Sequence, residues 1–131
     1  MKDISRLLLL SVATVALSVA SAHAADRVHA GQWETTIDSG ARTRVMKSCV
    51  TPAEADAANG DEKTFRESLA KAIAGTGCTV SEVKVSGNQV VTSSLCSGKK
   101  GTSTTNYHGD SYEQVSSNGT KVHAKRIGSC S

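Results

Sequence analysis

The chain has 131 residues, with 15 Lys and Arg against 12 Asp and Glu, which gives a net charge of +3. This length leaves room for one domain and excludes a second of ordinary size. The charge is too small to predict nucleic-acid binding, so nucleic acid is not an expected partner.

The first 24 residues have the pattern of a signal peptide. Lys2 and Arg6 make the start basic, residues 7–20 carry no charge, and Ala22-His23-Ala24 supplies the small side chains that a signal peptidase needs. The apolar run is shorter than the ~20 residues of a membrane-spanning helix. We therefore expect cleavage after Ala24, a periplasmic or secreted protein, and a single mature domain over residues 25–131 without a membrane span.

Two strands and the start of a helix are predicted next. Residues 33–37 alternate in the way of a half-buried strand. Ser39-Gly40 forms a turn, and residues 42–49 are the antiparallel partner. Thr51-Pro52-Ala53-Glu54 then provides an N-cap, a proline at the first helical position and a capping-box glutamate, so a helix begins there.

The helical segment continues past an interruption at Asn59-Gly60. Asp61 can cap its second part, in which Phe65, Leu69 and Ile73 recur every four residues and form an apolar stripe. We expect this stripe to pack on the sheet.

The rest of the chain predicts five more strands. They cover residues 79–86, 89–96, 102–108, 111–116 and 120–127, separated by turn sequences such as Gly87-Asn88, Gly109-Asp110 and Asn118-Gly119. The expected fold class is therefore mainly β, or α+β. It is an antiparallel meander of about seven short strands, curved or barrel-like, with one helical segment packed on it and two disulfides.

The disulfides are expected because the mature domain is poor in core residues. Only 16 of its 107 residues are Val, Ile, Leu or Phe, below the ~20% usual for globular domains. An even number of cysteines in an exported chain is typical of a disulfide framework, and their gaps do not match the Cys-x-x-Cys spacing of zinc sites. Of the three possible pairings, we favour Cys49 with Cys78, which brackets the helical segment, and Cys96 with Cys130, which pins the C-terminus.

Several short motifs follow one another along the chain. They are Gly31-x-Trp33-Glu34, Cys49-x-Thr51-Pro52-x-Glu54, Cys78, Ser86-Gly87-Asn88, Cys96, Gly109-Asp110-Ser111-Tyr112 and Arg126-x-Gly128-x-Cys130. This ordered set resembles the domain of unknown function 3617 family of small exported bacterial proteins, although the aromatic residue expected shortly before Cys96 is missing. The resemblance implies a periplasmic location and no established activity. For Trp33, Tyr112 and Gly128 we expect structural roles, in packing and in close backbone approach.

The densest cluster of reactive side-chain types is the turn from Tyr107 to Tyr112. Within it, His108, Asp110 and Ser111 are the candidate catalytic residues of a small hydrolase, since a serine nucleophile needs a base within hydrogen-bond reach and a group that orients it. Residues crowded into one hairpin seldom reach that geometry. A turn in which Asp110 binds nearby backbone amides explains the same residues.

Two rows of basic side chains form a further candidate site. Lys121, His123 and Lys125 alternate onto one face of the last strand, and Arg42 and Arg44 form a similar row on the second. Such rows could bind a polyanion of the cell envelope, whereas the alternative is a solvated face whose lysines discourage edge pairing.

A metal site is not expected. His108 and His123 could share an ion only if their strands were neighbours, and no third ligand accompanies them. We expect no cofactor.

The sequence thus predicts a small periplasmic binding or structural protein, whose partner is a small ligand or an envelope component. A hydrolase and a polyanion-binding module are the alternatives. Two observations separate these hypotheses: whether His108 and Asp110 converge in a pocket, and whether the basic rows form one contiguous face.

Overall fold

A computed structural model describes residues 26–131, so the predicted signal peptide lies outside the described residues. Seven strands and two helices follow one another in this part of the chain. They are β1 (Gly31–Asp38), β2 (Thr43–Val50), α1 (Pro52–Ala58), α2 (Glu62–Ile73), β3 (Cys78–Ser86), β4 (Gln89–Cys96), β5 (Lys99–Tyr107), β6 (Ser111–Ser116) and β7 (Lys121–Gly128).

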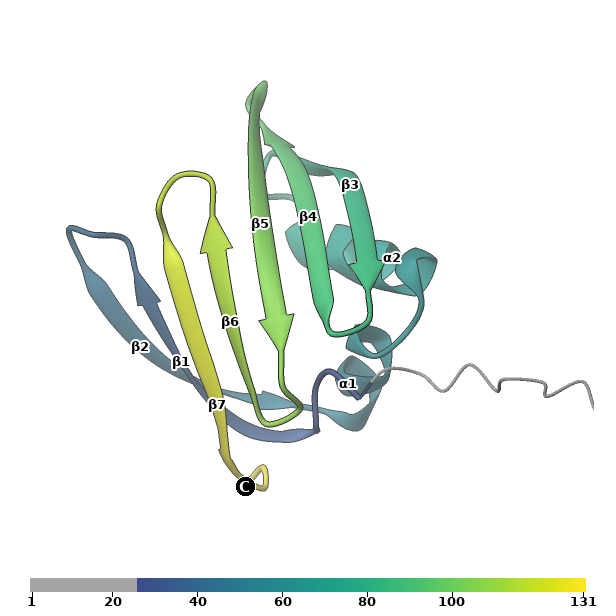
Figure 1. The fold of residues 1–131 in the computed structure, drawn as a ribbon, viewed down its shortest axis with the longest axis vertical. Helices are drawn as coiled ribbons and strands as arrows, with labels where there is room; N and C mark the ends of the chain where they lie inside the picture. Colours follow the sequence, from purple (N-terminus) through teal and green to yellow (C-terminus); the bar gives the residue numbers. More distant parts are fainter. Residues whose placement is uncertain (1–25) are drawn as a thin grey trace, which may run out of the picture.

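All seven strands belong to one antiparallel sheet, with the order β2-β1-β7-β6-β5-β4-β3. The pairing of β1 with β7 joins the two ends of the domain, whereas every other pair of neighbours in the sheet is consecutive in the sequence. Figure 1 shows a twisted, open sheet in which β2 and β3 are the two edges. The predicted fold class is confirmed, and the sheet does not close into a barrel.

The helical excursion consists of two helices where one segment was expected. Thr51 begins α1 with a complete capping box: its Oγ1 accepts from the N–H of Glu54 at 3.2 Å, and Glu54 Oε2 accepts from the N–H of Thr51 at 2.8 Å. Asp61 begins α2 by accepting from the N–H of Thr64 at 2.8 Å. The break between the helices follows from this second cap, because an N-cap residue has non-helical backbone angles.

The two helices pack on the sheet at different places. Phe65, Leu69 and Ile73 of α2 are half-buried, and α2 lies against β3, behind the strands in Figure 1. Ala58 of α1 packs against the core cluster of Val28, Trp33 and Ala124. We call the face that carries Trp33, Ala124 and Tyr112 the inner face and the opposite one the outer face.

The core is small and largely aromatic. Trp33 is only 2% exposed, and its ring centroid lies 5.8 Å from that of Tyr112, which in turn lies 5.5 Å from that of Tyr107. These are three of the four aromatic residues in the chain. Val83 and Val90 are the buried apolar residues of the neighbouring β3–β4 hairpin.

All four cysteines form disulfides, but the pairing that we favoured from the sequence is wrong. The bonds are Cys49–Cys130 and Cys78–Cys96, with Cα atoms 5.5 and 4.1 Å apart. Cys78 and Cys96 are register partners in the β3–β4 hairpin. The turn places Ser86 opposite Gln89, and a bulge between Val80 and Glu82 shifts the register by the one residue needed. Hairpin geometry therefore dictates the pairing.

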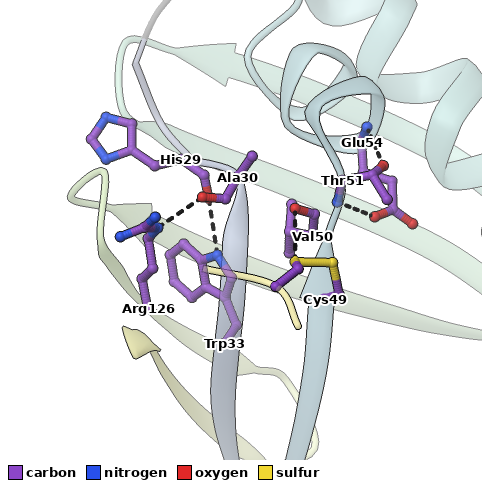
Figure 2. The surroundings of a disulfide bond; sticks show 9 residues. His29, Ala30, Trp33, Cys49, Val50, Thr51, Glu54 and Arg126 are labelled. Atoms are coloured by element: carbon purple, nitrogen blue, oxygen red, sulfur yellow. Dashed lines mark hydrogen bonds between the residues drawn. A yellow bond between two sulfur atoms is a disulfide. The ribbon is translucent and has the colours of Figure 1, made fainter. Parts of the chain in front are cut away.

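Cys49 and Cys130 join the edge strand β2 to the chain that follows β7, across the start of β1. Figure 2 shows this disulfide beside Trp33 and the first turn of α1. The bond fastens the outermost strand to the interior of the sheet. In the described part of the chain, no helix has the length and apolar character to cross a membrane.

Candidate functional site

The segment from Asp26 to Ala30, which we call the N-terminal arm, runs between the end of α1 and the turn that joins β5 to β6. The N–H of His29 donates to the Gly109 carbonyl at 3.0 Å, and the N–H of Gly109 donates to the Arg27 carbonyl at 3.1 Å. The Asn59 side chain binds both the N–H and the carbonyl of Val28, each at 2.8 Å. The arm is thus an integral part of the fold.

Arg27 anchors the arm although it is a charged residue. Its side chain is 2% exposed, and its guanidinium donates to the carbonyls of Ala58 at 2.8 Å, of Gly87 at 2.9 Å and of Gly60. Burial lowers the pKa of this group. Because two of these carbonyls belong to the end of α1 and the third to the β3–β4 turn, one side chain ties the arm to both.

His29 holds the arm to the β5–β6 turn. Its Nδ1 lies 2.7 Å from Asp110 Oδ1, and its Nε2 lies 2.8 Å from Asp26 Oδ2. The hydrogen bonds to Asp26 and Asp110 raise the pKa of His29, so the protonated ring is favoured and bridges two carboxylates. Gly109 makes room for this ring: with φ at +84°, a Cβ there would lie 3.1 Å from His29 Cε1.

The candidate hydrolase residues do not converge in a pocket. His108 is exposed, and its N–H donates to the main-chain carbonyl of Ser111 at 2.8 Å. The Asp110 carboxylate binds His29, which lies 81 residues earlier in the sequence and was not among the candidates. Both nitrogens of His29 are already bonded to carboxylates, so this histidine has no free nitrogen with which to activate a serine.

The two histidines considered as metal ligands are also separated. His108 follows β5 and His123 lies on β7, with β6 between these strands. Within residues 26–131, no group of three or more His, Cys, Asp or Glu side chains is placed to hold a metal ion.

The two basic rows lie on opposite faces of the sheet. Arg44 is the register partner of Ile37, so it is on the inner face, whereas Arg42 precedes β2 in a turn. Lys121 and Lys125 face outward, as the register partners of Asp38 and Glu34. Lys125 Nζ lies 3.6 Å from Glu34 Oε1. The outer face therefore alternates positive and negative side chains and is not a uniformly basic surface.

Two side-chain hydrogen bonds to the main chain of the N-terminal arm lie beside the Cys49–Cys130 disulfide. Arg126 Nε donates to the Ala30 carbonyl at 2.8 Å, and Trp33 Nε1 donates to the His29 carbonyl at 3.0 Å, as Figure 2 shows. A Cβ on Gly31 would lie 2.4 Å from Arg126 Nε and 2.5 Å from the Gly128 carbonyl. Only glycine at position 31 allows β1 and β7 to approach this closely.

A groove of about 380 Å³ lies between α1 and the inner face of the sheet. Apolar and aromatic side chains supply most of its lining, and a few polar ones join them. These residues are Val28, Val50, Ala58, Tyr107 and Tyr112, with Ser48, Cys49, Glu54 and Gln114. The volume is in the range of pockets that bind small molecules.

The two tyrosines of the groove are neutral at physiological pH. Burial raises the pKa of Tyr107 to about 12, and burial also raises that of Tyr112. Glu54 is committed to the α1 capping box, and Gln114 Oε1 accepts from Thr105 Oγ1 at 3.3 Å. The groove thus offers apolar contact with few polar groups.

Comparison with known proteins identifies a family for almost all of the described chain. Residues 28–130 match the family described as protein of unknown function DUF3617, which confirms the resemblance seen in the sequence. The match extends from the N-terminal arm to the last cysteine. No curated protein and no solved structure matches the chain.

Proposed function

We propose that this chain, which belongs to the DUF3617 family, is an exported binding protein that holds a small apolar or aromatic molecule in the groove between α1 and the sheet. The observation that carries the proposal is the groove itself, with a volume of about 380 Å³ and the rings of Tyr107 and Tyr112 in its wall. Pockets of this size and composition are typical small-molecule sites.

The groove favours a ligand with an apolar body. Val28, Val50 and Ala58 supply aliphatic contacts, and the two tyrosine rings offer faces against which an aromatic or flat ring can pack. The polar side chains are few and mostly hydrogen-bonded within the protein. Recognition therefore depends on shape and apolar area, with Ser48 and Gln114 available to orient one polar group.

Binding without conversion of the ligand is the better interpretation of this groove. Its tyrosine hydroxyls hold their protons far above neutral pH, because burial raises their pKa. His29, the histidine with hydrogen-bonded carboxylates on both nitrogens, contributes nothing to the groove lining. These features support a carrier or sensor of the ligand.

Two properties support a site of action outside the cytoplasm. The first 24 residues have a signal-peptide pattern, and all four cysteines are paired. Structural disulfides persist in oxidising compartments. Protein recovered from the periplasm should therefore begin at Ala25 and carry no free thiol.

The ligand site is tested with the fluorescent apolar probe 1-anilinonaphthalene-8-sulfonate. We expect the native protein to bind the probe, and Ser48→Phe to weaken binding at least about fivefold, because the added ring fills the groove. Val45→Phe is the matched control, since Val45 is on the same strand but on the outer face. The probe also binds loosened proteins, so each variant must keep its cooperative unfolding transition.

Failure of the native protein to bind the probe contradicts the proposed groove. Equal binding by the Ser48→Phe and Val45→Phe variants also contradicts it, because the probe would then occupy another surface.

A further inference from the structure

The two edges of the sheet are built differently. The β3 edge is protected in three ways: a bulge between Val80 and Glu82 interrupts its register, α2 packs against the strand, and Glu62 Oε2 accepts from the main-chain N–H of Val85 at 3.4 Å. Bulges and covering helices are the means by which proteins prevent edge pairing.

The β2 edge lacks this protection. Its register with β1 is unbroken from Gly31 opposite Val50 to Asp38 opposite Thr43, and seven of its eight residues are exposed. Within residues 26–131, β1 is the only strand that pairs with β2, so the other edge of β2 has free main-chain hydrogen-bonding groups. Val45 and Met46 are 60% and 44% exposed. A long, regular and uncovered edge is a template for an additional strand.

The edge is also held in place before any partner arrives. Cys49, near the end of β2, is bonded to Cys130 beyond β7, so the outermost strand is covalently fixed to the sheet interior. A pre-ordered edge loses less conformational entropy on binding than a mobile one does.

Charge indicates what kind of strand the edge accepts. Arg44 and Lys47 project from β2. On β1, Arg44 lies opposite the apolar Ile37, whereas Lys47 lies opposite Glu34, a carboxylate that it shares with Lys125 of β7. Pairing of β2 with the β2 of a second copy would align these cations, and Arg42, along one seam. Like charges on neighbouring strands are destabilising, so the charges disfavour a second copy and favour an acidic partner.

We propose that the β2 edge binds an extended segment of another protein, in which two acidic residues flank two apolar ones, and adds it as a further strand of the sheet. Arg44 and Met46 face inward, whereas Val45 and Lys47 face outward. The partner then places one carboxylate and one apolar side chain on each face. Acid-apolar-apolar-acid reads the same in both directions, so the motif fits a parallel or an antiparallel strand.

The test uses a fluorescein-labelled peptide, Ser-Thr-Glu-Val-Ile-Glu-Thr-Ser, with blocked ends, and the same peptide with both Glu replaced by Lys. Fluorescence anisotropy should show binding of the acidic peptide to the mature protein, at least about tenfold tighter than the basic one. In the double variant Arg44→Glu/Lys47→Glu this preference should reverse. The control is Lys99→Glu/Lys100→Glu, which changes the net charge equally at the far hairpin and should keep the preference for the acidic peptide.

Three results would overturn the proposal. They are no binding of the acidic peptide, equal loss of binding in the two double variants, and self-association in sedimentation analysis that Arg44→Glu/Lys47→Glu abolishes. The last result would assign the edge to a second copy. Because neither peptide resembles the apolar probe and the edge charges do not line the groove, this test is independent of the groove proposal.

Discussion

Arg27 and His29 act on the same arm by different physical means. Arg27 is buried and gives its donors to three main-chain carbonyls, so its removal would leave acceptors without partners. His29 is half-exposed and acts through charge, because its protonated ring bridges Asp26 and Asp110. The contribution of Arg27 therefore comes from buried hydrogen bonds, whereas that of His29 depends on the protonation of its ring.

The raised pKa of His29 predicts the direction of a pH effect on stability. Below the ordinary histidine pKa of 6.5, the imidazolium is present in the folded and unfolded states and its bridges contribute in full. As the pH rises through the higher folded pKa, the proton is lost and so is this contribution. The free energy of unfolding should therefore decrease as the pH rises above about 6.5, measured by urea unfolding with the fluorescence of Trp33.

The variant His29→Gln should lack this decrease. His123→Gln is the control, because His123 lies exposed on β7. A pH slope that persists in His29→Gln and disappears in His123→Gln would contradict the role given to His29.

Neither arm residue could be identified from the sequence. The acceptors of Arg27 are carbonyl groups, which any residue provides, and they lie 31, 33 and 60 residues away. Asp110 was a candidate because it stands beside His108 and Ser111. The histidine that Asp110 contacts is His29 of the N-terminal arm, and nothing in the sequence around Asp110 predicts that contact. Side-chain pairs at long separation depend on the complete fold.

At the scale of the elements, the sequence predicts turns and helix caps correctly, because neighbouring residues make them. Gly87-Asn88 fixed the β3–β4 hairpin, and Thr51 with Glu54 fixed the start of α1. Bracketing of the helices predicts the wrong disulfide pairing, because strand register decides which cysteines lie opposite each other. Counting back from the turn leads within one residue to Cys78 opposite Cys96, and the bulge supplies the difference.

The two disulfides should differ in their effect on stability. Cys49–Cys130 closes a separation of 81 residues and Cys78–Cys96 one of 18, so loop-closure entropy predicts losses of about 4.5 and about 3 kcal/mol when each pair is changed to Ala. Urea unfolding of the two double variants measures both values. A larger loss for the Cys78–Cys96 pair would show that strain or residual structure outweighs loop closure.

The whole molecule has too small a core to rely on apolar burial alone. Its buried apolar residues in the described chain are Val28, Trp33, Ala55, Val83, Val90 and Ala124, and two of these six are alanines. A domain with so little buried surface generally needs cross-links. The two disulfides supply them at the sheet edge and in the β3–β4 hairpin, and the hydrogen bonds of the arm join the end of α1 to the sheet. Two structural disulfides fit a protein that resides in an oxidising compartment.

The most direct test expresses the chain with and without residues 1–24 and measures the first residue, the free thiols and the resistance to protease of each product. The exported protein should begin at Ala25, carry no free thiol and resist digestion. The form retained in the reducing cytoplasm should carry four free thiols and be digested rapidly. A reduced cytoplasmic form that resists protease as well as the exported one would contradict the claim that this fold depends on oxidation outside the cytoplasm.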